Sequence, residues 1–226
     1  MANRKFYMTE LDHLTNEVIC MGNALEVMIG KVEVAIRDYD IELAQEVIES
    51  DDLIDAMESK IEKECIDLIA KQQPVARDLR RVSSCMRLIS DMERIGDHCE
   101  DICEYIIEMK KTNEKVESEN FYKMFKTMRA MLHKTIKSFA KEQIEVAREA
   151  VAMDDIVDAL FLEELAKIKE DIAAGKNIDF AINYLLIVKY VERMGDHAAN
   201  IAEWVHYLVG GELEASMHLE SNISVN

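Results

Sequence analysis

Two closely similar motifs, one in each half of the chain, place carboxylates at a spacing suited to binding a cation. They are Glu-Arg-Ile-Gly-Asp-His-Cys-Glu-Asp-Ile at Glu93–Ile102 and Glu-Arg-Met-Gly-Asp-His-Ala-Ala-Asn-Ile at Glu192–Ile201. In each copy the Glu and the first Asp are four positions apart, so on a helix they lie on one face, one turn apart. Like charges at this spacing destabilise a helix by roughly 0.2–0.5 kcal/mol. Keeping that cost in both copies indicates a cation site.

A second pair of carboxylates precedes each motif, again at a spacing of four. The pairs are Asp51 with Asp55 and Asp154 with Asp158. If the helices that carry them run antiparallel beside the motif helices, each repeat gathers four or five carboxylates. Oxygen ligands suit Mg, Mn, Ca or Fe, and several carboxylates together can hold a multinuclear cluster. With no thiolate or His at ligand spacing, a structural zinc site is not expected.

The acidic stripe of each motif is expected to face away from the core of its own bundle. At ~100° per residue, the apolar residues of each motif helix fall on one side and the acidic residues on the other. The two stripes consist of Glu93, Asp97 and Asp101, and of Glu192, Asp196 and Asn200. Buried di-iron bundles instead use Glu-x-x-His on inward faces. His98 and His197 lie well round the helix from the stripe, so we expect them to flank the sites.

An ordinary solvated acidic face is the alternative explanation of these stripes. Two further features of the motifs weigh against it. Gly96 and Gly195 occupy the same place in both copies, although Gly in mid-helix costs ~1 kcal/mol relative to Ala; a close helix crossing would explain them. Arg94 and Arg193 lie inside an otherwise acidic patch, where they could orient the carboxylates.

The composition is that of an all-helical protein: 226 residues with one Pro and seven Gly, about half of them apolar. Apolar spacing predicts six helices, with Pro74 and Gly175 marking breaks between them and the polar segment Lys110–Asn120 acting as a linker. The predicted ranges are Phe6–Arg37, 41–71, Val75–Met109, Phe121–Phe139, Glu142–Ala174 and Ile178–Val209.

The repetition extends beyond the motifs. Ile41–Asp55 aligns with Ile144–Asp158 at an offset of 103 positions, whereas the motifs are offset by 99; a change in loop length absorbs the difference. The sequence therefore predicts an all-α fold of two tandem three-helix bundles that arose by internal duplication. We expect the first repeat at residues 1–113, the second at 114–211, and a C-terminal tail at 212–226.

The charge and the cysteines narrow the class of protein. A net charge of −18 repels nucleic-acid phosphate, so we expect no nucleic-acid partner. Five cysteines form an odd number without a CxxC pair, which favours reduced thiols in a cytoplasmic core. We see no signal peptide and no apolar stretch of the ~20 residues that span a bilayer.

Catalytic motifs are not evident. The sequence has no GxxxxGK[ST], GxGxxG, GxSxG or HExxH pattern. We therefore expect that the chain is not an enzyme. A hydrolase with Glu93 as general base over a metal ion stays open as an alternative.

Taken in order, these motifs resemble the PhoU family of phosphate-signalling proteins. The resemblance rests on two copies of Glu-Arg-hydrophobic-Gly-Asp, each preceded by Asp-x-x-x-Asp, and on Gln-Pro-Val-Ala-Arg-Asp-Leu-Arg at Gln73–Arg80. It covers the chain from about Phe6 to Gly211. It implies two three-helix bundles with pseudo-two-fold symmetry and multinuclear metal clusters on the bundle surfaces.

The resemblance also implies which residues hold metal. Asn200 replaces the acid at Asp101, so the second site would carry one charge fewer. The first site would use Asp51, Asp55, Glu93, Asp97 and Asp101, and the second would use Asp154, Asp158, Glu192, Asp196 and Asn200. The ions would be divalent or trivalent, with Fe, Mn, Mg and Zn as the candidates.

In function, the resemblance implies a negative regulator of phosphate-starvation signalling and of phosphate uptake. Such a protein is similar to adaptors that link the ATPase of a phosphate ABC transporter to a sensor histidine kinase. It would be a cytoplasmic homodimer that associates peripherally with the membrane. The alternative is a metal- or iron-handling helical protein without a signalling role.

Overall fold

The computed structural model describes residues 2–112 and 114–211, and all regular structure in this part of the chain is helical. This confirms the all-α prediction. The expected tail at 212–226 lies outside the described residues. The elements are α1 (Ala2–Asp38), α2 (Ile41–Gln72), α3 (Arg77–Met109), a short 3-10 turn η1 (Lys110–Thr112), α4 (Glu119–Lys141), α5 (Ile144–Val151), α6 (Asp154–Ala173) and α7 (Ile178–Gly210).

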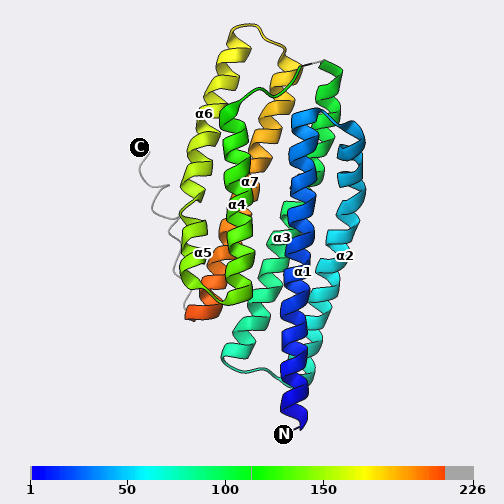
Figure 1. Cartoon of the computed structure of the whole chain (residues 1–226), viewed down its shortest axis with the longest axis vertical. Helices are drawn as coiled ribbons and strands as arrows, with labels where there is room; N and C mark the ends of the chain where they lie inside the picture. Colours follow the sequence, from blue (N-terminus) through cyan, green and yellow to red (C-terminus); the bar gives the residue numbers. More distant parts are fainter. Residues whose placement is uncertain (1, 113, 212–226) are drawn as a thin grey trace.

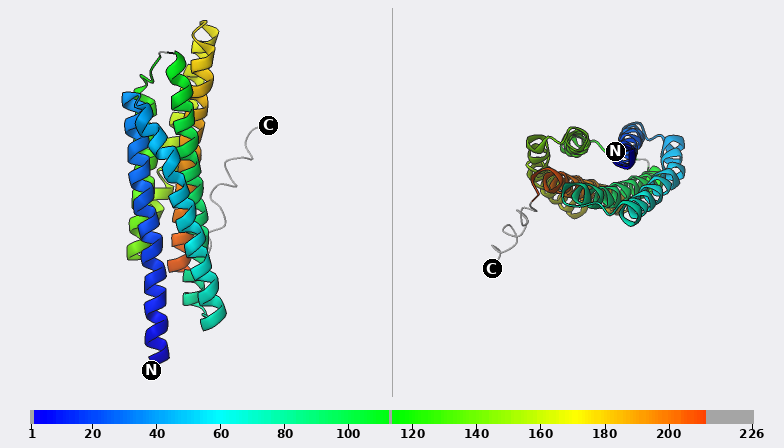
Figure 2. Two further views of the ribbon diagram at one scale, coloured as in Figure 1. Left: turned by 90° about the vertical axis from the view of Figure 1, so that its right-hand side faces the viewer. Right: turned by 90° about the horizontal axis from the view of Figure 1, so that it is seen from below.

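The helices form two elongated bundles that lie side by side. Helices α1 to α3 make one bundle and α4 to α7 the other, with α3 and α7 between them (Figure 1). The end-on view in Figure 2 shows α3 and α7 side by side along one face of the molecule, with α1 and α4 packed against them on the opposite face. The contact between α3 and α7 is the broadest between any two helices of the described chain. The two motif helices therefore form the seam of the molecule.

The apolar faces predicted for the two motif helices are buried. Each of their members is at most 1% exposed: Leu88, Met92, Ile95, Cys99, Ile102 and Ile106 in α3, and Val191, Met194, Ala198, Ile201 and Val205 in α7. Because helical periodicity fixes the opposite face at the same time, the acidic stripes are turned out of both bundle cores.

Local sequence signals explain where three helices begin and where one ends. The side chains of Asp40, Ser118 and Asn177 accept hydrogen bonds from backbone N–H groups in the first turns of α2, α4 and α7. Gly211 ends α7 in the left-handed conformation, with φ of 84°. Helix α3 begins two residues later than predicted, because Ala76 has φ of 49° and ψ of −117° and so cannot be helical.

One predicted helix is wrong as a single element. The expected helix Glu142–Ala174 is divided into α5 and α6 by a turn at Ala152 and Met153. At this turn the hydrogen bonding changes from the α-helical to the 3-10 type, because Met153 N–H donates to the Ala150 carbonyl, three residues back, at 3.1 Å. Neither Gly nor Pro marks this turn in the sequence, so helical periodicity alone could not reveal it.

The cysteine prediction needs one correction. Cys65, Cys85, Cys99 and Cys103 are buried as expected, but Cys20 is exposed. Val18 and Met21 lie in the core, and Cys20 is turned by about 200° from Val18 on the same helix, so it faces outward.

Candidate metal centre

Two glycines bring the acidic helices together. A Cβ added to Gly96 in α3 would lie 3.0 Å from Asp51 Oδ1 and 3.1 Å from Ile54 Cγ2, both on α2. In the second repeat, a Cβ at Gly195 in α7 would lie 3.2 Å from Val157 Cγ1 and 3.4 Å from Asp154 Oδ1 on α6. Because a glycine has no Cβ, the helices can cross closely beside the carboxylates in both repeats, and most tightly at Gly96. The close crossing predicted from the sequence is confirmed.

The first cluster joins α2 and α3. Asp51, Asp55 and Asp97 each offer one carboxylate oxygen, and these oxygens lie within 4.8 Å of one another. Asp51 is only 7% exposed, and its Oδ1 is buried without a hydrogen-bond partner in the described chain. A buried carboxylate oxygen without a donor is costly. A bound cation would remove that cost.

A carboxylate that the sequence analysis missed belongs to this cluster. Burial, and then the nearby charges of Asp55, Glu100 and Asp97, raise the pKa of Asp51 to about 7. Glu100 lies close enough to Asp51 for each carboxyl group to alter the pKa of the other. Glu100 lies one helical turn after Gly96, the glycine against which Asp51 packs. A carboxylate one turn after the crossing glycine is the sequence feature that could have identified it as part of the site.

Glu93 lies at the outer edge of the same cluster. Its pKa is raised by burial first and then by Asp97, with smaller effects from Asp55 and from Glu58 on α2. Arg94 crosses this edge: its Nη1 donates to Asp97 Oδ2 at 2.8 Å, and its Nε lies 3.4 Å from Glu93 Oε2. The orienting role predicted for this arginine agrees with these contacts.

The second cluster joins α6 and α7 in the same way. Oxygens of Asp154, Asp158 and Asp196 lie within 4.8 Å of one another, and Asp154 is 3% exposed. Glu192 lies beside them, but its Oε2 accepts a hydrogen bond from Lys189 Nζ at 2.5 Å. The Lys189 ammonium also lies 5.1 Å from the centre of the Phe161 ring, in a cation–π contact.

Asp101 and Asn200 make their hydrogen bonds in the seam between α3 and α7. Asp101 Oδ2 lies 3.3 Å from His98 Nδ1, and Asn200 Nδ2 donates to Asp91 Oδ1 at 3.3 Å. His197 Nδ1 lies 2.8 Å from the same Asp91 oxygen.

The two motif histidines therefore face each other across the seam. The His98 and His197 ring centroids are 5.6 Å apart. Of the ten residues predicted as ligands, the structure brings together the two Asp triplets, with Glu93 and Glu192 beside them. It gives Asp101 and Asn200 partners in the seam instead.

The chemistry of both clusters fits a hard or borderline metal ion. Each combines carboxylates from two helices, held at a fixed separation by the glycine crossing, with one member almost fully buried. Carboxylate oxygens with this convergence are ligands for Mg, Mn, Fe or Ca.

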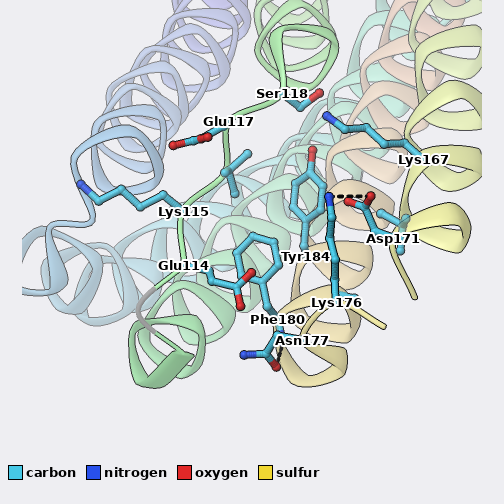
Figure 3. Close-up of a pocket in the computed structure, with 13 residues that line it drawn as sticks. Glu114, Lys115, Glu117, Ser118, Lys167, Asp171, Lys176, Asn177, Phe180 and Tyr184 are labelled. Carbon is cyan, nitrogen blue, oxygen red and sulfur yellow. Dashed lines mark hydrogen bonds and ion pairs between the residues drawn. The ribbon is translucent and has the colours of Figure 1, made fainter. Parts of the chain in front are cut away.

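A separate pocket of about 300 Å³ lies where the linker crosses the second bundle (Figure 3). Lys115 and Lys167 line it, and Lys176 forms an ion pair with Asp171 there at 2.8 Å. At its base the Tyr184 hydroxyl donates to the buried Glu164 at 2.6 Å, and the hydroxyl of Ser118 donates to Glu164 as well. These bonds fix the linker onto α6 and α7, far along α6 from Asp154.

Within the part of the chain that the structure describes, none of the helices has the length and apolar composition required to cross a membrane.

Comparison with known proteins places both halves of the chain in one family. The family model of the PhoU domain matches residues 18–106 and again residues 121–205. A Phosphate-specific transport system accessory protein PhoU homolog from Clostridium acetobutylicum is 30% identical over 211 residues, which is 92% of this chain and 96% of that protein. The homolog from Aquifex aeolicus is 33% identical over 215 residues, covering 93% of this chain and 96% of that protein.

Solved structures agree with the sequence comparison. The phosphate transport system regulatory protein PhoU from Streptococcus pneumoniae superposes with a TM-score of 0.86 at 29% identity, covering 92% of this chain and 98% of that one. PhoU from Pseudomonas aeruginosa gives a TM-score of 0.86 at 30% identity, covering 91% and 100%. With two tandem PhoU domains matched over most of its length, the chain belongs to the PhoU family.

Proposed function

We propose that this chain is a metal-binding regulatory adaptor of phosphate homeostasis. It would act as a negative regulator of the phosphate-starvation response and of phosphate uptake, linking the ATPase of a phosphate ABC transporter to a sensor histidine kinase. The names of its relatives, a transport-system accessory protein and a transport-system regulatory protein, support the regulatory part. We place it in the cytoplasm as a homodimer that associates with the membrane through these partners.

The observation that carries the metal-binding part is the recurrence of one arrangement in both repeats. In each, a glycine crossing sets an almost fully buried Asp against an Asp pair from two helices. A solvated acidic face has no need of the buried position, because an exposed carboxylate is fully hydrated without a partner. The arrangement therefore supports a role for the clusters as cation sites.

Deletion of the gene tests the regulatory role. In cells grown at high phosphate, we expect a phosphate-starvation reporter to rise several-fold above the wild-type level, because the signal that silences the kinase is lost. An unchanged reporter would contradict the regulator and favour a metal- or iron-handling protein without a signalling role.

Complementation separates signalling from metal binding. The double variant Asp97→Asn/Asp196→Asn removes one carboxylate charge from each triplet and is expected to restore silencing only in part. The matched control is Asp52→Asn/Asp155→Asn, since both residues are exposed and adjoin the clusters at equivalent positions of the two repeats. Phosphoester turnover above background by the purified chain would support the hydrolase alternative instead.

Capture from membranes of phosphate-replete cells tests the partners. Recovery of the transporter ATPase or the sensor kinase with the full chain would support the adaptor role, and recovery of neither would contradict it.

A further inference from the structure

The two carboxylate clusters differ at positions that flank the shared triplets. Residues of α2 correspond to residues of α6 at an offset of 103, and residues of α3 correspond to residues of α7 at an offset of 99. Three flanking pairs change their chemistry between the first and the second repeat: Glu58 to Phe161, Ser90 to Lys189, and Glu100 to Ala199. Each change makes the second cluster less negative than the first.

In the first cluster, the flanking residues add carboxylate oxygens. Glu100 lies beside Asp51, the most buried member of the triplet. Glu58 lies close enough to Asp55 and Glu93 for the charges to repel. The only basic side chain found at this cluster in the described chain, Arg94, is 57% exposed at its outer edge.

In the second cluster, the flanking residues supply a cation of the protein's own. Lys189 donates to Glu192 and acts electrostatically on Asp196 as well. Its ammonium is held over the ring of Phe161, the residue that replaces Glu58. Arg193, the counterpart of Arg94, acts on His98 and Tyr190 in the seam instead.

The unpartnered oxygen of the first cluster points to a ligand. Asp51 Oδ1 is buried, lacks a hydrogen-bond partner in the described chain, and lies beside the space that Gly96 leaves free. Cation affinity at oxygen sites rises with the number of ligand charges. A tethered ammonium competes with a metal ion for the same carboxylates and repels it.

We propose that the first cluster is the dominant metal site of this chain and that Lys189 and Ala199 weaken the second. This inference rests on the proposed metal binding and goes beyond it, because it assigns unequal roles to the two repeats. Glu100 is a metal-site residue by this account, and Lys189 acts as a built-in substitute for part of the metal charge.

Titration of the metal-free full chain with Mn²⁺ tests this inequality. We expect the wild type to show a tight and a weaker class of sites. Glu100→Gln, which keeps the size of the side chain, should weaken the tight class by about tenfold, because one ligand charge is lost. Lys189→Ser, which gives the second repeat the residue of the first, should tighten the weaker class by about tenfold, because the competing ammonium is removed.

The control variant is Lys134→Ser, which removes a lysine whose ion pair with Glu149 lies outside the clusters; both classes should keep their affinity. Equal affinities in the wild type, or a Lys189→Ser chain that binds Mn²⁺ no more tightly, would overturn the inequality alone. No Mn²⁺ bound at either cluster would overturn the metal part of the proposed function as well, so the two failures are distinguishable.

Discussion

The two carboxylate clusters share a scaffold and differ in the charge around it. In both, a glycine allows α2 or α6 to approach the motif helix, and Asp residues from the two helices converge within 4.8 Å. Around this scaffold the first cluster has Glu58 and Glu100, whereas the second has Phe161 and a lysine bound to its own Glu192.

This difference shows what the duplication has kept and what it has left free to change. The glycine determines the helix crossing, so a larger residue in its place would disturb the packing of the two helices. The flanking residues Glu58, Glu100, Phe161 and Lys189 are half-buried, so charge at these positions can change without altering the crossing itself. One architecture can thus carry two cation sites of different strength.

Replacing one Asp of each triplet in turn should give the largest difference between the two clusters, measured as the loss of bound metal. We expect Asp97→Asn to abolish most of the Mn²⁺ retained by the full chain after desalting, because it disables the stronger site. Asp196→Asn should remove only a minor part. Elemental analysis of protein loaded with Mn²⁺ and desalted measures both, and equal losses would contradict the comparison.

The buried carboxylate of the first cluster should make the metal-free protein less stable as the pH rises. In the folded chain the pKa of Asp51 is raised to about 7 from an ordinary value of 3.8. Below pH 4 both states hold the proton; between pH 4 and 7 only the folded state does, so the free energy of unfolding falls with rising pH. Above pH 7 the whole penalty is present, and Asp51→Asn should be more stable than the wild type by roughly 2–4 kcal/mol.

Urea unfolding in chelator at pH 5 and pH 8 measures this effect. Asp52→Asn serves as the control, since that carboxylate is exposed and its loss should change little at either pH. At pH 8, saturating Mn²⁺ should make the wild type more stable than Asp51→Asn, because the wild type gains binding free energy that the variant lacks. If the gain in unfolding free energy from Asp51→Asn does not increase with pH, the claim that burying the charged Asp51 carboxylate destabilises the metal-free fold is wrong.

Replacing the two crossing glycines by Ala should change the free energy of unfolding by smaller and unequal amounts. Ala in place of Gly gains up to ~1 kcal/mol of helix propensity, but at Gly96 the added Cβ meets Asp51 and Ile54 at 3.0 and 3.1 Å. We expect a net loss of about 1–2 kcal/mol for Gly96→Ala. At Gly195 the nearest contacts are 3.2 and 3.4 Å, so Gly195→Ala should be closer to neutral. Denaturant unfolding checks the order, and the reverse order would show that the second crossing is the tighter one.

Periodicity predicted those features that depend on a single helix. The buried faces of α3 and α7 and the outward acidic stripes follow directly from 3.6 residues per turn. The repeated glycines predicted the close crossing, because a mid-helix Gly without a packing reason is unfavourable. The turn at Ala152 and Met153 was missed because no Gly or Pro marks it.

Features that depend on how two helices are rotated relative to each other were not predictable. On a helical wheel Asp101 lies closer than Glu100 to the centre of the acidic stripe, so the sequence pattern favours Asp101 as the metal ligand. The structure instead sets Glu100 against Asp51 and turns Asp101 towards His98 in the seam. The contact of Lys189 with Phe161 also joins two helices, and neither residue belongs to a repeated motif.

The central claim is that the repeated carboxylates bind metal and that the first cluster binds it more strongly. Anomalous diffraction from crystals of the full chain grown with limiting Mn²⁺ tests this directly, because it locates each ion. We predict strong peaks beside Asp51, Asp55 and Asp97, with weaker or missing peaks beside Asp154, Asp158 and Asp196. Peaks of equal strength at both clusters would contradict the inequality, and the absence of peaks from both would contradict the claim as a whole.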